Sequence, residues 1–578
     1  MTEETESYHS DSEDDQEFED AEDVPEDVDM TLDRALNECQ EAIRYFFNNQ
    51  FKEARSLLSP YSHTSMYHSL GECVFLFMEA VLTFEPDAIK AAIKSLKHAI
   101  SLCNRHRKKN TIGESLGKMV RKSNFEQYTE LEAHAELCYA ECLLFRSMLS
   151  FMEDESLGSL IKAGIKIRSC YNSYKDCRQI LLKRKWEVGS TKEHFESGVR
   201  MGIGAFSLMI SMMPARIIKL LEFIGFSGDR QHGLNEIAIG YSMNGVRQIM
   251  CVMMMLGYNL FFFPVLSHRD GDLKTCKELM QTQLRQYPDS VWFLFFEGRM
   301  NLLLGNLDSS KDWYIKSWRS QNVWPQFHHI CFWELVWVHC LKIEWREALV
   351  YCQQLLEKSK WSRSLYSYQK AVIMCMIKEE LTQSELDEMN KLMKNVPRYK
   401  QRIAGKSLPM EKFAIKKAER YFNQNQNLVL PVFEIMFVWN LFKLLKYFSV
   451  ASKILKVIEK SLEDLESKST SSKYDNDNKA LILLLKGACL RHMGSPILAL
   501  DCLETVISMQ KYLIEDHYIV PYAIVELALI EWQNGNGDKA ILALEDAKKN
   551  YTGYSLESRL HFRIHTALTE FKAENKKI

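Results

Sequence analysis

The sequence contains little glycine and proline. Its 578 residues include 24 glycines and 12 prolines, which is about half the usual share of these two residue types. A β-sandwich, a β-barrel or a βαβ enzyme needs a turn every several residues, and glycine and proline form many of those turns. We therefore exclude these classes and expect an all-α protein.

Closely spaced cysteines are also missing. The 15 cysteines run from Cys39 to Cys502 without one Cys-x-x-Cys pair, whereas disulfide scaffolds are short and dense in cysteine. The acidic N-terminal residues lack the apolar segment of a signal peptide. These features predict a cytoplasmic protein with reduced, mostly buried thiols.

Long apolar runs are nearly absent. The mean hydropathy is −0.24, which excludes a polytopic membrane protein and leaves peripheral membrane association at most. Residues 248–267 carry no charge but only just reach the length of a membrane span. We interpret this stretch as a buried helix, with a span as the alternative.

Lysine and arginine are absent from the first 29 positions, which hold 15 acidic residues. The rest of the chain has 61 acids and 73 bases, so the net charge of −3 hides an acidic tail on a basic body. Segments this charged and this poor in apolar residues do not fold alone. We predict an acidic, disordered tail over residues 1–30.

Small residues recur at the spacing of a tetratricopeptide repeat, in which two helices cross closely. Gly487 and Ala499 stand twelve positions apart, and Ala528 and Ala540 repeat that spacing. The predicted repeat-packing positions are Ala42, Ala54, Gly298, Ala348, Gly487, Ala499, Ala528 and Ala540. Such helix pairs bury their apolar faces only by stacking, so we predict a helix–turn–helix superhelix, an α-solenoid.

Composition divides the chain into segments. Those predicted after the tail are N-terminal helical repeats at 31–190, an apolar Met-rich helical insert at 191–268, central helical repeats at 269–466, a polar linker loop at 467–478 and C-terminal tetratricopeptide repeats at 479–578.

Seven blocks occur in the order of a known family. They are SMYHSLG at 65–71, LCYAECLL at 137–144, GIGAF at 202–206, PARIIKLLEFIGFSGDR at 214–230, QFHHICFWELVW at 326–337, GKSLPMEKFAIKKAERY at 405–421 and YSLESRLHFRIH at 554–565. The chain resembles the tetratricopeptide repeat protein 39 family, which is related to a fungal inclusion-body-clearance group. The resemblance implies a non-enzymatic scaffold connected with lipid and sterol homeostasis or with regulated protein turnover, at the endoplasmic reticulum or the lipid droplet surface.

Signatures of catalysis and of cofactors are missing. Gly202 and Gly204 lack the third glycine of a dinucleotide loop, and no Walker sequence occurs. His561 and His565 are spaced for zinc but lack the accompanying glutamate. The short basic runs lack interleaved stacking aromatics. We expect no enzyme activity, no cofactor, no metal and no nucleic-acid partner.

Two side-chain types gather in the middle of the chain. Eight of eleven tryptophans lie between Trp292 and Trp361, where we expect most to fill the core and some to line a groove for client proteins. Methionines are dense over residues 199–267. Methionine adapts to irregular partners, so this region is either a buried helix pair or an apolar pocket or membrane-facing surface. A peripheral membrane or lipid-binding protein is therefore the alternative function.

The tail holds one short motif. Residues 17–23, EFEDAED, resemble the FFAT motif, two phenylalanines in an acidic tract, which binds the MSP domains of VAMP-associated proteins on the endoplasmic reticulum. The resemblance assigns contacts to Glu17, Phe18, Asp20, Ala21 and Asp23. Phosphorylation of Ser10 and Ser12, each followed by an acid three residues on, would add negative charge. An alternative is that the tail folds back on the basic body and occludes it.

Overall fold

The chain is all helical, as expected. The computed structural model describes residues 30–83, 85–108, 124–153, 157–211, 228–400, 408–468 and 471–575. These residues form twenty-five α-helices with short 3₁₀ and π segments, and no strand occurs among them.

The N-terminal part consists of consecutive helices packed in pairs. They are α2 (Leu32–Phe47), α3 (Phe51–Leu58), α4 (Met66–Thr83), α5 (Pro86–His106), α7 (Glu130–Glu153) and α8 (Leu157–Lys183). Thr31 caps α2, since its side chain accepts a hydrogen bond from the backbone N–H of Arg34. Ala35, Cys39 and Ala42 then follow at helical spacing and form the buried face of α2.

The Met-rich insert also folds into helices. They are α9 (Lys192–Ser211), α11 (Arg230–Tyr241), α12 (Gln248–Gly257), the π-helical turn η3 (Tyr258–Phe262) and α13 (Phe263–Leu266). The last three are continuous, and the π turn lies directly before Pro264, which has no N–H to donate. Among the described residues, only Gln248–Leu266 has the length and hydropathy of a membrane span, and half of its most apolar window is buried within the fold.

The central and C-terminal helices continue the array. The central ones are α14 (Leu273–Gln286), α15 (Val291–Leu303), α16 (Leu307–Arg319), α17 (Gln326–Lys342), α18 (Trp345–Lys358), α19 (Arg363–Cys375), α20 (Gln383–Asn395), α21 (Pro409–Asn423), α22 (Pro431–Val438) and α23 (Phe448–Glu466). The C-terminal ones are α24 (Asp475–His492), α25 (Pro496–Ser508), α26 (Ile519–Gln533), α27 (Gly537–Lys549) and α28 (Glu557–Asn575).

One predicted boundary is corrected here. The linker expected over residues 467–478 ends earlier, because α24 begins at Asp475. Asp477 lies in the first turn of that helix, is fully buried, and accepts hydrogen bonds from three consecutive backbone N–H groups at residues 514–516. The polar composition of this segment therefore reflects buried hydrogen bonding as well as a loop.

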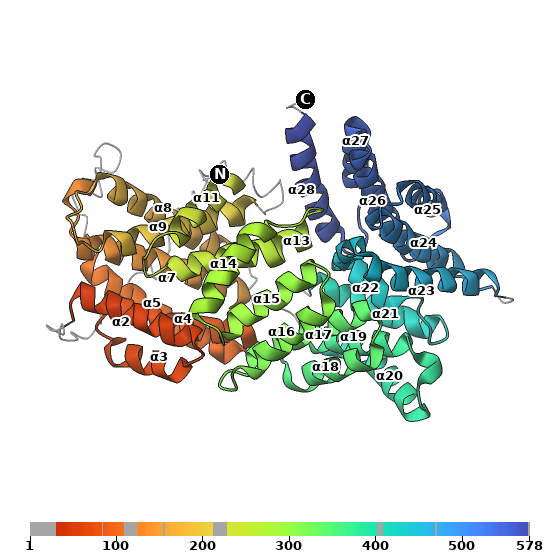
Figure 1. Cartoon of the computed structure of the whole chain (residues 1–578), viewed down its shortest axis with the longest axis horizontal. Helices are drawn as coiled ribbons and strands as arrows, with labels where there is room; N and C mark the ends of the chain where they lie inside the picture. Colours follow the sequence, from red (N-terminus) through yellow and green to blue (C-terminus); the bar gives the residue numbers. More distant parts are fainter. Residues whose placement is uncertain are drawn as a thin grey trace, which may run out of the picture.

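Neighbouring helix pairs stack, and some segments that are distant in sequence also make contact. Each helix pair packs on the next, as in α15, α16 and α17 or α24, α25 and α26, and the array runs from α2 to α28 (Figure 1). In addition, Phe47 of α2 stacks on Phe293 of α15, and the side chain of Asn49 bonds to the backbone of Asp289 and Val291. At the other end, α28 contacts α13. Repeat solenoids usually contact only neighbouring repeats. Here, in addition, the N-terminal repeats pack against the central ones, and α28 packs against the end of the insert.

Candidate functional site

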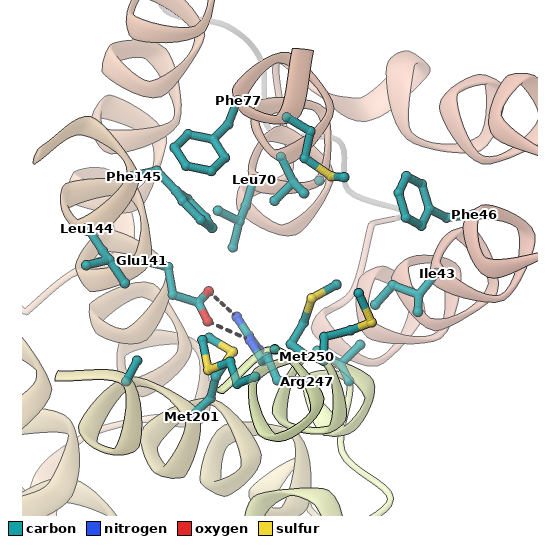
Figure 2. Close-up of a pocket in the computed structure, with 18 of the residues that line it drawn as sticks. Ile43, Phe46, Leu70, Phe77, Glu141, Leu144, Phe145, Met201, Arg247 and Met250 are labelled. Carbon is teal, nitrogen blue, oxygen red and sulfur yellow. Dashed lines mark hydrogen bonds and ion pairs between the residues drawn. The ribbon is translucent and has the colours of Figure 1, made fainter. Parts of the chain in front are cut away.

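An apolar cavity lies where the N-terminal helices meet the Met-rich insert. Its volume is about 560 Å³, and its walls come from α2, α4, α7, α9 and α12, with contributions from η3 and α15. Figure 2 shows side chains from these helices converging on the space, with Phe77 and Phe145 at the upper left, Phe46 at the right, and Met201 and Met250 below. Segments about 200 residues apart in sequence therefore share one site.

Methionine and aromatic side chains dominate the lining. The methionines are Met78, Met201, Met209, Met250, Met253 and Met254. The rings are Phe46, Phe47, Tyr67, Phe75, Phe77, Phe145, Tyr258, Phe262 and Trp292. Five of the six methionines come from the predicted insert, for which an apolar pocket was one of the alternatives.

A buried ion pair forms the polar part of the wall. Arg247 donates from Nε and Nη2 to the two carboxylate oxygens of Glu141, at 2.9 and 2.6 Å, and from Nη1 to the Tyr67 hydroxyl at 2.8 Å. Figure 2 shows the guanidinium and the carboxylate facing each other across the cavity floor. The pair joins the start of α12 to α4 and α7 and so holds three walls in fixed positions.

The hydrogen bonds continue away from the cavity. The Tyr67 hydroxyl lies 2.6 Å from Nδ1 of His134, and Nε2 of that ring lies 2.9 Å from the Thr191 hydroxyl. Burial and then the charge of Arg247 lower the pKa of His134 well below its usual value. Burial raises the pKa of Tyr67. Burial alone would lower the pKa of Arg247, but Glu141 outweighs it and raises that pKa. At neutral pH the wall therefore holds one cation, one anion and neutral partners.

The cavity reaches the surface at η3. Phe262 lines it and is 57% exposed, while Met253 and Met254 are half-buried. Gly257 also lines the space, and a β carbon added there would meet no atom within 4 Å. This edge is therefore the open side of the cavity.

The predicted repeat-packing residues lie at helix crossings away from this opening, although Ala42 also lines the cavity. Ala54, Ala348, Ala499, Ala528 and Ala540 are fully buried, and Ala42 is nearly so. A β carbon on Gly298 would come within 2.7 Å of the Tyr314 ring, and one on Gly487 within 2.9 Å of Leu503. At the first crossing Ser310, which stands where the repeat usually has alanine, donates a hydrogen bond to the carbonyl oxygen of Gly298.

The predicted tail contacts lie outside the described residues. These are the FFAT-like residues Glu17, Phe18, Asp20, Ala21 and Asp23 and the phosphorylation candidates Ser10 and Ser12.

The aromatic cluster lies in packed positions. None of the eight tryptophans between Trp292 and Trp361 is exposed. Trp324 packs against Phe46, Phe51 and Phe75 of the N-terminal helices. Trp324 therefore joins the N-terminal and central repeats, and Trp292 alone among the eight lines the cavity.

Cysteines and histidines do not assemble into a metal site in the described part of the chain. No group of three or more His, Cys, Asp or Glu side chains there is placed to hold an ion. All fifteen cysteines are free, and fourteen are buried.

Arg247, Glu141 and Tyr67 were not predicted from the sequence as site residues. The available signals were weak: Arg247 is the last charge before the uncharged stretch 248–267, and Glu141 interrupts an apolar helical run. Neither signal indicates a partner about 100 residues away. The aromatic wall from α2 and α4 had no signal at all, because those residues have the spacing of ordinary core positions.

Comparisons with known proteins agree with this architecture. The model of the family described as Iml2/Tetratricopeptide repeat protein 39 matches residues 40–493. The chain is 33% identical over 539 residues to Tetratricopeptide repeat protein ttc-39B of Caenorhabditis elegans, a match that covers 92% of each chain.

Two solved structures have low similarity to the chain. One is a chain of the APC/C hetero-tetramer Cut9–Hcn1. It is 12% identical, the match covers 90% of this chain and 95% of that chain, and the TM-score is 0.24. The other is yeast Tom70, which is 13% identical. This match covers 94% of this chain and 96% of that chain, and the TM-score is again 0.24. Similarity this low adds nothing about binding. The family model and the nematode relative, in contrast, each cover most of the sequence, and the chain belongs to the Iml2/tetratricopeptide repeat protein 39 family.

Proposed function

We propose that the chain is a non-enzymatic adaptor whose helical repeats bind client proteins. The observation that carries this proposal is the stacked repeat array with large apolar side chains exposed on its C-terminal repeats. Ile497 and Leu498 on α25 are 81% and 60% exposed, and Leu542 on α27 is 65% exposed. Ile497 and Leu498 are adjacent in sequence, and neighbouring exposed apolar side chains are typical of protein-binding sites.

Proximity labelling in cells tests the client surface. The full chain is compared with the double variant Ile497→Asp and Leu498→Asp, with Val350→Asp as the matched control. Val350 is also an exposed apolar residue on a helix, at 58% exposure, but belongs to a central repeat. We expect the double variant to lose a set of neighbours that the control retains. Identical neighbour sets in all three proteins would contradict the proposal.

The acidic tail supplies a tether to the endoplasmic reticulum in this proposal. Support comes from the resemblance of residues 17–23 to the FFAT motif and from the acidic residues before it, which would steer it toward a basic groove. Binding of the full chain to a purified MSP domain is measured by titration. Phe18→Ala should weaken it by about tenfold or more, and Val28→Ala, a tail substitution outside the motif, should not. Equal affinities would remove the tether.

Lipid or sterol homeostasis or regulated protein turnover is the process that this adaptor would serve. The support is family membership alone. Depletion of the protein should change either cellular neutral lipid or the ubiquitination of a labelled client. A null effect on both would leave the adaptor without this role.

Lipid binding by the Met-rich region is the second candidate function. It is supported by the cavity, whose lining includes five methionines of the insert. The full chain should float with phosphatidylcholine liposomes in the absence of other proteins. Failure to float would argue against a peripheral membrane protein.

A further inference from the structure

The cavity has the size of a small-molecule site. Its volume of about 560 Å³ lies within the range of about 300–1,000 Å³ for ligand pockets. One turn of an α-helix with its side chains is about 10–12 Å across and about 5.4 Å long, and so occupies about 400–600 Å³. A partner helix anchored through residues i, i+3, i+4 and i+7 needs at least two turns. The volume therefore favours a small ligand over a peptide helix.

The side chains that line the cavity favour an uncharged, apolar ligand. Arg247 and Glu141, the two charged side chains in the wall, are 5% and 3% exposed and neutralise each other through two hydrogen bonds. A third charge inside the cavity would find no free counter-ion and would lose its hydration, which is costly. The enclosed part of the ligand is therefore uncharged.

Methionine side chains indicate a flexible ligand. The six thioether side chains around the cavity bend easily and fit irregular or variable shapes. An alkyl chain, which changes conformation along its length, matches such a wall better than a rigid polar molecule does. The rings of Phe46, Phe77 and Phe145 complete the apolar surface.

The open side at η3 leaves a place for a polar group. Phe262 stands there with more than half of its surface exposed, next to half-buried methionines. We propose that the cavity bounded by α2, α4, α7, α9 and α12 binds the hydrocarbon chain of one lipid, with the polar head outside near Phe262. This inference rests on the second proposed function and names its ligand and its site.

Two substitutions fill the cavity from different walls. Gly257 has ordinary helical torsions, with φ −59° and ψ −44°, and open space at its β carbon, so Gly257→Phe places a ring there without a backbone clash. Ala205→Phe does the same from α9. Ala91→Phe, on the exposed face of α5, is the matched control. Circular dichroism melts show whether each variant is folded.

The test is a titration of the full chain with 11-(dansylamino)undecanoic acid, a soluble fluorescent alkyl chain. We expect saturable binding at one site per chain. Each filling variant should weaken it by about tenfold or more, and the control should match the native chain. Hexadecanol and palmitate should compete within about threefold of each other, because the head stays outside. A second arm offers phosphatidylcholine vesicles with one fluorescent acyl chain and measures whether the protein extracts that lipid, which separates a free alkyl chain from a membrane lipid as the source.

Two results would overturn the inference. One is the absence of saturable binding in both arms, which would indicate that the cavity is filled by the chain itself. The other is native affinity in both folded filling variants, which would place the probe elsewhere. If the protein floats with liposomes but does not bind the probe, the lipid-binding cavity is rejected and peripheral membrane association is retained. If it binds the probe but does not float, the cavity is retained and peripheral membrane association is rejected.

Discussion

Removal of Arg247 is the sharpest test of how the cavity is held together. Arg247→Met keeps a long side chain but leaves the Glu141 carboxylate buried, at 3% exposure, without its two donated hydrogen bonds. It also removes the donor to the Tyr67 hydroxyl. Breaking one partner of a buried ion pair costs about 3–5 kcal/mol.

That free energy translates into two distinct melting shifts. Unfolding entropy is about 2.1 cal/mol/K per residue, so the melting temperature of the 578-residue chain, melting as one unit, would fall by about 2–4 °C. Repeat arrays often unfold in parts. A cooperative unit made of the N-terminal repeats and the insert, residues 31–268, would instead lose about 6–10 °C. Scanning calorimetry distinguishes the two cases.

The double variant Arg247→Met and Glu141→Met supplies the decisive comparison. A buried ion pair replaced by apolar side chains of similar volume is often neutral, and the Tyr67 hydroxyl retains its contact with His134. We expect the double variant to recover most of the stability lost in the single variant. A double variant as unstable as Arg247→Met, or a single variant that melts within about 1 °C of the native chain, would refute this reasoning.

Three further predictions concern packing, pH and the C-terminal helix. Gly298→Ala brings a β carbon within 2.7 Å of the Tyr314 ring and should lower the free energy of unfolding in urea by about 1–3 kcal/mol. Gly257→Ala, where the β carbon meets open space, should leave that free energy unchanged or raise it by up to about 1 kcal/mol. Equal effects of the two substitutions would contradict this. Burial and the neighbouring cations lower the pKa of His268 to about 3, whereas its unfolded value is about 6.5. Between these values the unfolded state binds more protons, so the melting temperature should fall as pH decreases from 6.5 toward 5, and less steeply in His268→Asn. Glu570 pairs with Arg230 of the insert and with Arg269 just after it, and Glu574 pairs with Arg269. Replacing both glutamates by glutamine should therefore speed hydrogen exchange in α28, as 0.5 M salt should in the native chain; unchanged exchange would show that these ion pairs do not hold α28 in place.

Contacts between distant repeats change how an adaptor of this kind would work. An open solenoid offers its concave face to partners, but here α2 and α3 pack against the central repeats, and α28 reaches α13. The interior between the N-terminal repeats and the insert is a cavity of ligand size. Client proteins are therefore expected at the exposed C-terminal helices, and a lipid chain in the interior.

Local patterns in the sequence were enough to predict the helices and their pairing. Small residues at twelve-residue spacing indicated the crossings at Gly298 and Gly487, since only a small side chain fits where two helix backbones approach closely. The scarcity of glycine and proline and the helical periodicity are short-range properties, and they predicted the all-α class. The end of the polar linker after Glu466 was predicted wrongly. A buried aspartate such as Asp477 cannot be distinguished from a loop aspartate by sequence alone.

The tertiary structure alone decided what the middle of the chain does. Methionine content suggested either a packed helix pair or a pocket, and both outcomes satisfy the same periodicity. The cavity exists because Phe46 and Phe77 of the N-terminal repeats face Met201 and Met250 of the insert, and because Arg247 reaches Glu141 from 106 positions away. Contacts between such distant segments depend on how the repeats curve, and curvature is the sum of many small crossing angles. No local pattern encodes that sum. The sequence therefore indicated the Met-rich wall as one of two alternatives, and only the fold brought the aromatic wall against it.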